Sequence, residues 1–375
     1  MPKRWSTIIL AMIIYFLATS ILLAENLGDG TKIDRNSPVK IMDDVKCISS
    51  GFFQTLIIKT DNTFWACGHN VIGVLGNNTK DPRDTPEKIL DAIACVSAGG
   101  EHSLILKLDG SLWGCGSNSE GQLGSASEDE ALSPIKILDG VKAMSAGWNY
   151  SMIIKKDDSL WACGNNAHGQ LGDVPINARH ELFHIMDNVR DVKCGDSITL
   201  ILSKDGTVWA CGSTQHGGFG NGTKDFSTDK PLKIADNAIA IASGQDNSYF
   251  VKNDNSLWGC GLNYCGTLGD GTYNDHYYFI KMMDSVIAIS ASETFVLILK
   301  KDTSLWACGG GIVNAKPPYN KTYGQLGDGT LIPRNKFVKV MTDVHYISAG
   351  YFHSMVIKND NSLWGFGWNG TADIF

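Results

Sequence analysis

A Trp-x-Cys-Gly tetrad returns along the chain at a nearly constant period, and this repeat limits the fold more than any other feature. Six copies begin at Trp65, Trp113, Trp161, Trp209, Trp258 and Trp306, and a seventh, Trp-Gly-Phe-Gly, begins at Trp364. Successive copies lie 48, 48, 48, 49, 48 and 58 residues apart, and the last interval is longer because residues 309–320 contain an insertion of ten. A fixed period of this length is typical of propellers and other repeat architectures.

Two further positions keep phase with the tryptophan. An Asp stands four residues before it in all seven units, at Asp61, Asp109, Asp157, Asp205, Asp254, Asp302 and Asp360. Fourteen residues before it stands a residue that we call the phase glycine, at Gly51, Gly99, Gly147, Gly195, Gly244 and Gly350, with Ser292 in the sixth unit. Seven copies in phase do not arise by chance, so the units must fold alike.

Each unit predicts about four β-strands. In the third unit, SMIIKKDDSLWACG has two short apolar stretches around a polar turn. The second and fourth units place Asp-Gly in this turn, which is the strongest short signal for a β-hairpin. The Asp side chain can bond the backbone two residues further on, which explains its presence in every turn. An apolar stretch such as AIACVSAGG and a weaker one such as SPIKIL precede the hairpin, and no segment has a helical period.

Seven units of four strands predict an all-β fold, a seven-bladed β-propeller formed by residues 25–375 as one domain. A large ring in each unit would fill the wedge between neighbouring blades. A solenoid of strands would need atypical capping repeats, whereas the first and last units here are ordinary. The segment Leu27-Gly28-Asp29-Gly30-Thr31 is the tail of a repeat, and the residues after Trp364 are the head of the same phrase. We therefore expect the two chain ends to close the ring.

The N-terminal segment, residues 1–24, has the pattern of an export signal. Lys3 and Arg4 precede a nearly continuous apolar run from Ile8 to Ala24, and polar Glu25 follows. This pattern predicts a signal peptide that is cleaved near Ala24, and hence a secreted, cell-surface or periplasmic protein. The alternative is an uncleaved membrane anchor formed by residues 8–24, since the run is close to the length that spans a bilayer. No other stretch is long and apolar enough to insert in a membrane.

The charge balance argues against one class of partner. The formal net charge is −7 at pH 7, and it becomes more negative without the basic N-terminal segment. General binding to nucleic acid requires a positive field, so we expect no nucleic-acid partner.

Three phrases resemble the repeats of the regulator of chromosome condensation family. They are Gly-x-x-His-Ser at 99–103 and 350–354, Asp-Gly-Ser-Leu-Trp at 109–113, and Asn-x-x-Gly-Gln-Leu-Gly at 118–124 and 166–172. The resemblance covers essentially all of residues 27–375 and implies a seven-bladed propeller, here of the exported bacterial type. The name-giving eukaryotic member is a nucleotide-exchange factor for a small GTPase. Exported bacterial members include an inhibitor of β-lactamases, and plant relatives include an ultraviolet photoreceptor. What these proteins share is a ring face that binds another protein.

The cysteines and histidines do not form a recognisable chemical motif. Six of the ten cysteines occupy one slot of the repeat, which Phe366 fills in the seventh unit, so we interpret this slot as a packing position. One or two disulfides among Cys47, Cys95, Cys194 and Cys265 remain open. His102 and His353 share a slot with five other residue types, which favours a turn position over catalysis. The sequence thus predicts no metal site, no cofactor and no catalytic residues, although a site in the central channel stays open.

The residues after each phase glycine carry the best functional signal. They should lie on one face, close to the propeller axis, and large aromatic residues in such variable turns are typical of protein-binding hot spots. The predicted partner-binding set comprises Phe52, Phe53, Glu101, His102, Trp148, Tyr150, Asp246, Phe295, Tyr351 and Phe352. The alternative is that these rings cover the channel mouth or pack between blades. The insertion at 309–320 is a second candidate, because long loops often carry function.

These observations favour an exported, non-catalytic and monomeric scaffold that binds a protein through one propeller face. A propeller enzyme or glycan binder that uses the central channel is the alternative, and converging carboxyl groups with perturbed pKa values would favour it. Nucleotide exchange on a small GTPase is a third reading, which requires a cytosolic location.

Overall fold

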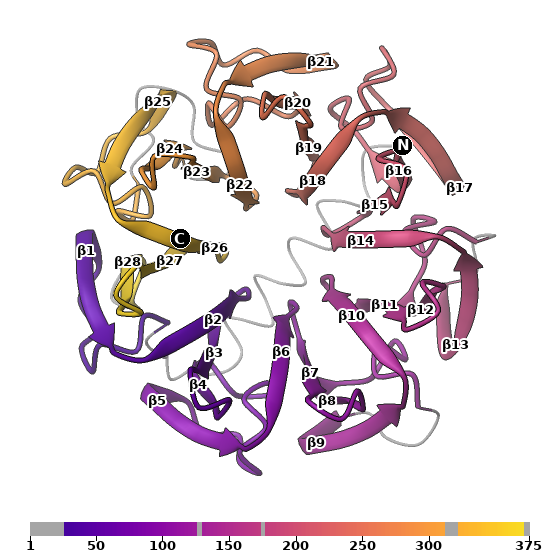
Figure 1. The fold of residues 1–375 in the computed structure, drawn as a ribbon, viewed down its shortest axis with the longest axis vertical. Coiled ribbons are helices and arrows are strands. Elements are labelled where there is room, and N and C mark those ends of the chain that lie inside the picture. The colour runs from indigo at the N-terminus through magenta and orange to yellow at the C-terminus, as the bar shows by residue number, and fades with distance from the viewer. Residues whose placement is uncertain (1–25, 126–129, 174–176, 312–321, 371–375) are drawn as a thin grey trace, which may run out of the picture.

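Seven four-stranded antiparallel sheets are arranged around a central axis in the computed structural model (Figure 1). The structure describes residues 26–125, 130–173, 177–311 and 322–370. Each sheet is one blade of a β-propeller, and the described residues contain no helix. The predicted all-β, seven-bladed propeller is therefore confirmed.

The blades follow one another in chain order. The first three are β2 (Val45–Ser50), β3 (Gln54–Lys59), β4 (Phe64–Gly68), β5 (Arg83–Leu90); β6 (Ile93–Ala98), β7 (His102–Lys107), β8 (Leu112–Ser117), β9 (Glu130–Leu138); and β10 (Val141–Ala146), β11 (Tyr150–Lys155), β12 (Leu160–Asn165), β13 (Ala178–Met186). The next three are β14 (Val189–Cys194), β15 (Ile198–Ser203), β16 (Val208–Thr214), β17 (Phe226–Ala235); β18 (Ala238–Ser243), β19 (Asn247–Lys252), β20 (Leu257–Gly261), β21 (His276–Met283); and β22 (Val286–Ala291), β23 (Phe295–Lys300), β24 (Leu305–Gly309), β25 (Arg334–Met341). The seventh is β26 (Val344–Ala349), β27 (His353–Lys358), β28 (Leu363–Gly367) and, from the other end of the chain, β1 (Arg35–Met42).

The two chain ends close the ring in the predicted way. The first strand, β1, pairs antiparallel with β28 and completes the seventh blade. The Asn369 side chain accepts a hydrogen bond from the backbone N–H of Leu27 at 3.1 Å. It also donates to Asp29 Oδ1 and to the Thr31 carbonyl at 2.9 and 2.7 Å. The segment Leu27–Thr31 and the residues that follow Trp364 are thus in contact, although more than 300 residues of sequence separate them.

The second strand of each blade lies deepest in the protein. In β15 all six residues are buried, and in the other second strands the first five are. Both faces of such a strand pack against a neighbouring blade, which explains why these segments are continuous apolar runs rather than alternating ones. The outer strands, such as β5, alternate between exposed and partly buried residues because one face meets solvent.

The repeated Asp and Trp form one hydrogen-bonded unit in the hairpin turn. In all seven blades the Asp carboxylate accepts a bond from the backbone N–H two residues further on, as predicted. The Ser or Thr at that position accepts a bond from the indole N–H of the Trp in six blades. In the fourth blade, Trp209 donates instead to the Ser203 hydroxyl at 2.9 Å.

The seven tryptophans lie between blades, as predicted. Each packs against a hydrophobic cluster formed by two neighbouring blades; Trp113, for example, covers Leu56, Ile58 and Ile105. A Lys from the second strand lies over the ring in six blades, at 3.5 Å from the ring centroid for Lys155 and Trp161. The Trp side chains therefore contribute to the packing between blades, and each remains partly exposed.

All ten cysteines are free thiols, so no disulfide forms among Cys47, Cys95, Cys194 and Cys265. The six cysteines of the repeat slot are buried, like Phe366 in the same slot, and this confirms the packing interpretation. Burial raises the pKa of the Cys115 and Cys163 thiols to about 12.

Parts of the sequence prediction lie outside the described residues. They are the export signal or anchor at 1–24 and, apart from residues 309–311, the insertion at 309–320. Within the described ranges, no helix has the length and apolarity needed to cross a membrane.

Candidate functional site

The turns between the first and second strands of all blades meet around the axis at one face. Adjacent inner strands are linked there by serine hydroxyls, which accept backbone N–H bonds from the next blade at Ser49, Ser97, Ser145, Ser290 and Ser348. The phase glycines follow directly after these strands. A Cβ atom at Gly99 would lie 2.6 Å from the Gly147 carbonyl oxygen, and one at Gly195 would lie 2.4 Å from that of Gly244. Glycine is required at this position because the backbones of neighbouring blades approach so closely.

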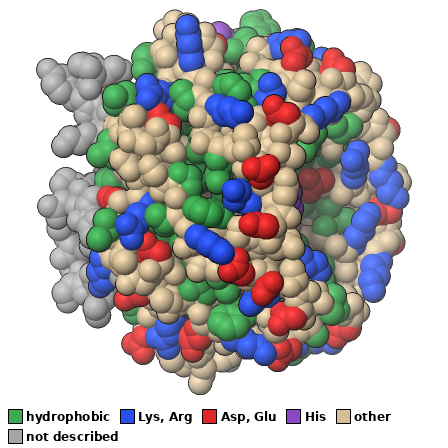
Figure 2. Space-filling model, turned by 60° about the vertical axis from the view of Figure 1, so that its left-hand side comes forward, with side chains coloured by type: hydrophobic (Ala, Val, Ile, Leu, Met, Phe, Trp, Pro, Cys, Tyr) green, Lys and Arg blue, Asp and Glu red, His purple; other side chains and the backbone are tan. Residues whose placement is uncertain are grey.

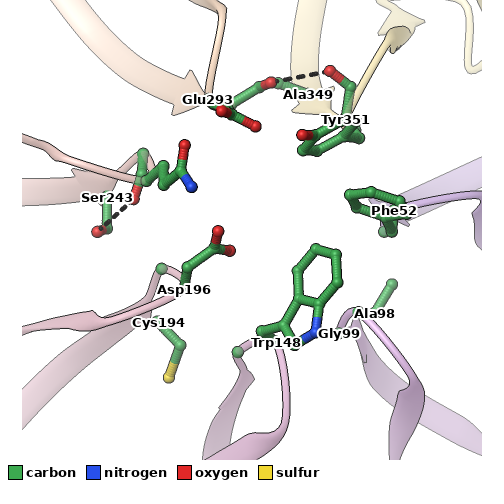
Figure 3. Close-up of a pocket in the computed structure, with 18 of the residues that line it drawn as sticks. Phe52, Ala98, Gly99, Trp148, Cys194, Asp196, Ser243, Glu293, Ala349 and Tyr351 are labelled. Carbon is green, nitrogen blue, oxygen red and sulfur yellow. Dashed lines mark hydrogen bonds between the residues drawn. The ribbon is translucent and has the colours of Figure 1, made fainter. Parts of the chain in front are cut away.

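The residue after each phase glycine points into a central cavity of about 150 Å³. We call this cavity and its rim the channel mouth. Six side chains line it from this position (Gly100 contributes none): Phe52, Trp148, Asp196, Gln245, Glu293 and Tyr351. Figure 3 shows that they divide the mouth into an aromatic half and a polar, mainly acidic half.

The aromatic half is a contact between three separate blades. The ring centroid of Phe52 lies 3.9 Å from that of Tyr351 and 4.5 Å from that of Trp148. Gly100 lies on the blade between Phe52 and Trp148, and a Cβ atom there would lie 3.0 Å from Cδ2 of Trp148. The missing side chain at Gly100 therefore gives the indole the space to reach Phe52. All three rings remain partly exposed.

A second row of aromatic residues supports these rings from behind. Phe53 contacts Trp368 with 5.3 Å between ring centroids, and Phe352 contacts Tyr323 at 5.2 Å. Phe352, Tyr323 and Trp368 are buried in one cluster with Phe53 and Tyr351 at its edge. Phe52 contacts Phe53 and Tyr351 contacts Phe352, so this packing holds two of the three rings in place.

The acidic half holds carboxyl groups that burial makes hard to ionise. Burial raises the pKa of Glu293 to about 8, and the nearby charges of Asp196 and Asp246 add to the effect. Burial, with the charge of Asp246, also raises the pKa of Asp196 to about 7. Glu293 is only 8% exposed, and its Oε2 atom has no hydrogen-bond partner among the described residues. A buried acceptor without a partner is costly, so this oxygen is ready for a donor.

Several residues of the predicted partner-binding set lie below the surface. His102, Tyr150 and Phe295 are fully buried, and Phe352 is 6% exposed. His102, Tyr150 and Phe295 open second strands, and Phe352 directly precedes one. Side chains at the start of these strands reach the neighbouring blade: His102 Nε2 lies 2.8 Å from Ser151 Oγ, and the Tyr150 hydroxyl donates to the Ile198 carbonyl at 3.0 Å. The histidine slot is thus a contact between blades rather than a turn position, and burial lowers the pKa of His102 to about 3.

The remaining members of the set lie at or beside the channel mouth. Phe52, Trp148 and Tyr351 line the cavity, and Phe53 supports them. Glu101 is partly buried, and burial with the charge of Glu120 raises its pKa. Asp246 is partly buried too, and its pKa is raised mainly by burial.

Sequence reasoning did not select Asp196, Gln245 and Glu293 as site residues. They occupy the same position of the repeat as Phe52 and Trp148, directly after the phase residue. Selecting every residue at this position of the repeat, whether aromatic or not, would have found them.

The outer surface is repetitive and carries mixed charge. Lys and Asp three residues apart pair beside the outer strands of five blades, as in Lys40–Asp43 and Lys281–Asp284. Figure 2 shows basic and acidic side chains interleaved over this side of the molecule. Exposed pairs of this kind contribute little and define no single binding surface. In the described part of the chain, no three His, Cys, Asp or Glu residues are placed to hold a metal ion.

Known structures share this fold at low sequence identity. Human WBSCR16 aligns with a TM-score of 0.69 and 21% identity, over 83% of this chain and 94% of that one. Yeast RCC1 (Prp20), in its structure with Kap60, aligns with a TM-score of 0.68 and 19% identity, over 93% of this chain and 83% of that one. A second structure of Prp20p from Saccharomyces cerevisiae was reported with its binding properties to Gsp1p and histones. It aligns with a TM-score of 0.64 and 20% identity, over 87% of this chain and 82% of that one.

The comparison with curated proteins finds no match. The sequence model of the RCC1-like domain, in contrast, matches residues 93–374. Because this match spans well over half of a chain that folds as seven complete blades, the protein belongs to the RCC1-like domain family.

Proposed function

We propose that the protein is a non-catalytic scaffold that binds another protein through the channel mouth. One observation carries the proposal: the rings of Phe52, Trp148 and Tyr351, from three different blades, meet in partly exposed positions where the repeats differ. Large aromatic side chains held in place at a surface are the commonest anchors of protein interfaces.

The rigidity of the mouth supports this role. Tyr351 packs on the buried cluster of Phe352, Tyr323 and Trp368, and Phe52 contacts Phe53 at the edge of that cluster. Backbone hydrogen bonds such as Tyr351 N–H to the Gly51 carbonyl join the turns to their neighbours. A partner that docks here therefore orders few side chains, and the entropy cost of binding is small.

The size of the cavity also favours a protein partner. Sites for small molecules usually have about 300–1,000 Å³. The central cavity has about 150 Å³, which accommodates one side chain rather than a sugar chain or a metabolite. A protein could place one side chain in the cavity and cover the surrounding turns with its own surface.

Relatives of the same fold support a protein as the class of partner. Yeast RCC1 is found with Kap60, and its binding to Gsp1p and histones has been described. At 19–20% identity this likeness shows the fold alone, so none of these partners is assigned to the present chain.

A ligand site in the channel is a second candidate, because carboxyl groups do converge there. Glu293 and Asp196 line the cavity, Asp246 lies close enough to affect both, and all three carboxyl groups have raised pKa values. Paired carboxyl groups of this kind are also used to cleave sugars. Incubation with a panel of glycans, followed by product analysis, tests this candidate. Product that disappears in the Glu293→Gln variant would establish it.

Nucleotide exchange on a small GTPase is the third candidate. It is compatible with the fold, but it requires a cytosolic protein, and residues 1–24 have the pattern of an export signal. N-terminal sequencing of the protein purified from its own cells decides whether the segment is removed, and cell fractionation decides in which compartment the protein resides.

The main proposal is tested by affinity capture with the tagged full chain in its own cells. Beside it we would use the triple variant Phe52→Ala, Trp148→Ala, Tyr351→Ala and a control variant, Tyr278→Ala. Tyr278 lies on the outer strand β21 and is 68% exposed, so the control removes an aromatic ring far from the mouth.

The expected result is a protein that the wild type and the control capture and the folded triple variant does not. Titration of the purified partner should then show at least a hundredfold weaker binding to the triple variant, about 2.7 kcal/mol. Equal binding by all three chains would contradict the proposal and place the interface elsewhere.

A further inference from the structure

The channel mouth lacks a positive charge opposite its acids. Of the residues that line the cavity, Asp196 and Glu293 are acidic and none is Lys, Arg or His. Asp246 adds a third carboxyl group close enough to affect both, as the raised pKa of each shows. An acidic cavity with no internal counter-ion is complementary to a cation from outside.

Glu293 provides the most specific observation. Its side chain is more than nine-tenths buried and points into the cavity, as Figure 3 shows. The neighbouring Ser292 hydroxyl donates to the Tyr351 carbonyl at 3.0 Å and does not bond the carboxyl group. The Tyr351 side chain also interacts with the Glu293 carboxyl group and opposes the rise of its pKa, but the Oε2 atom has no hydrogen-bond partner among the described residues.

The aromatic half suits the same kind of ligand. The rings of Phe52, Trp148 and Tyr351 surround the cavity opposite Asp196 and Glu293 (Figure 3). A cation is attracted to the face of an aromatic ring, most strongly to that of Trp, and the attraction grows where water is excluded. The methylene groups of a long basic side chain would contact the same rings.

We propose that the cavity receives the ammonium group of a lysine side chain presented by the protein partner. This inference rests on the proposed function and specifies the chemistry of the partner. The ammonium group donates to Glu293 Oε2, Asp196 lies beside it, and the lysine methylenes lie against the cavity side of the aromatic rings. A guanidinium group has five donors in a fixed plane and suits a carboxylate with both oxygens free, whereas of the two Glu293 carboxyl oxygens only Oε2 is found buried without a partner. Metal ions such as Ca²⁺ require six to eight oxygen ligands, which a half-aromatic mouth does not supply.

Binding should depend on pH in a defined direction. The groups that face Glu293 are Asp196, Asp246, Tyr264, Cys265 and Tyr351. Burial raises the pKa values of Tyr264, Cys265 and Tyr351 above their ordinary values, so these groups stay neutral. Burial also raises the pKa of Asp246, and the nearby His216 partly offsets this effect. Because the carboxyl groups interact, each proton that leaves belongs to the group of carboxyls as a whole rather than to one residue. A cation binds only to the ionised form. Affinity therefore rises as pH increases from 6 to 8.5.

The first experiment measures the chemistry of the cavity without the partner. The full chain is titrated with n-butylammonium, n-butylguanidinium and neutral n-butanol, and binding is followed by ligand-observed NMR. We expect saturable, millimolar binding of n-butylammonium that strengthens at least about tenfold from pH 6 to 8.5, weaker binding of n-butylguanidinium, and none of n-butanol. Equal binding of all three probes, stronger binding of the guanidinium, or binding that weakens with rising pH would overturn the proposal.

Two matched variants test whether n-butylammonium binds at Glu293. Glu293→Gln keeps the size of the side chain and removes its charge, and it should weaken n-butylammonium binding at least about tenfold at pH 8.5. Asp91→Asn removes an exposed carboxyl group with 72% side-chain exposure and should leave binding unchanged. Unchanged binding by a folded Glu293→Gln protein would contradict the inference.

The same variants separate this inference from the proposed function. A partner that is lost by the aromatic triple variant but bound equally by wild type and Glu293→Gln would overturn the lysine site and leave the protein-binding function standing. A partner bound equally by the triple variant would overturn both. Loss of the partner from both variants, with n-butylammonium competing for the wild type, supports both.

Discussion

The rings of Phe52 and Trp148 lie 4.5 Å apart at their centroids, although these residues belong to the first and third blades of the propeller. The second blade contributes Gly100 between them, and the indole of Trp148 lies against its backbone. The aromatic half of the channel mouth thus depends on one residue without a side chain as much as on the three rings.

The first prediction concerns Gly100→Ala. A Cβ atom at this position would lie 2.9 Å from the Trp148 carbonyl oxygen and 3.0 Å from its Cδ2 atom, so the indole must move away from Phe52. Affinity for the partner should fall at least about tenfold, or about 1.4 kcal/mol, while the blades remain folded. Titration of the purified partner measures this effect.

The control for that variant is Gly140→Ala, which adds the same methyl group at a turn away from the channel mouth where nothing lies within 4 Å of it. Because Gly140 has a φ of +75°, this control costs some stability, so only its partner affinity is compared. Its partner affinity should equal that of the wild type. Equal affinity of the Gly100→Ala protein would show that the position of the indole is irrelevant to binding.

A second prediction compares two equivalent threonines. The Thr63 hydroxyl accepts the indole N–H bond of Trp65 at 2.8 Å, whereas Trp209 donates to Ser203 and not to Thr207. Thr63→Val should lower the free energy of unfolding by about 1 kcal/mol, and Thr207→Val should lower it less. Urea unfolding of both variants checks the order, and a larger loss for Thr207→Val would refute the role of this bond.

Stability at the channel mouth should depend on pH. The pKa of Glu293 is about 8 and that of Asp196 about 7 in the folded protein, and both lie near 4 in an unfolded chain. Between these values the folded protein holds protons that the unfolded chain has released, so the free energy of unfolding falls as pH rises from 5 to 8.5.

Glu293→Gln removes part of this dependence. The free energy of unfolding of the variant minus that of the wild type should increase as pH rises. The increase should be about 1.4 kcal/mol for each pH unit between the unfolded and folded pKa values of Glu293. Thermal unfolding at pH 5.5, 7 and 8.5 measures the difference. A difference that is constant with pH would mean that Glu293 is ionised throughout.

Ring closure gives a fourth prediction. The fully buried Asn369 side chain bonds Leu27, Asp29 and Thr31 at the other end of the chain. Asn369→Ala removes these three bonds and should lower the free energy of unfolding by about 1–3 kcal/mol, although Asp29 keeps its bonds to Thr31 and Arg35. Asn359→Ala, at an exposed position, is the control and should have almost no effect. Equal melting temperatures for the two variants would exclude a role for this contact in closure.

Much of the fold is predictable because it depends on local periodicity. The strands, the Asp bond in each hairpin and the pairing of β1 with β28 follow from residues that recur at fixed positions. The histidine slot was misplaced for a physical reason. A polar residue three positions after a glycine looks like part of a turn, yet His102 opens a strand and bonds Ser151 of the next blade.

The channel mouth was predictable in part. The repeat places the variable residues of all blades on one face, which identifies Phe52, Trp148 and Tyr351. Their mutual contacts depend on the space left by Gly100, and the state of Glu293 depends on burial by neighbouring blades. Neither property belongs to a single repeat, so a pattern within one unit cannot reveal it.

The most direct test of the account asks where the partner touches the propeller. A photo-crosslinking amino acid is placed at position 245 in the channel mouth or at position 278 on the outer strand β21, and each protein is irradiated with the bound partner. The account predicts a crosslink from position 245 and none from position 278. A crosslink from position 278 alone would contradict it, because the partner would then bind the outer surface and not the channel mouth.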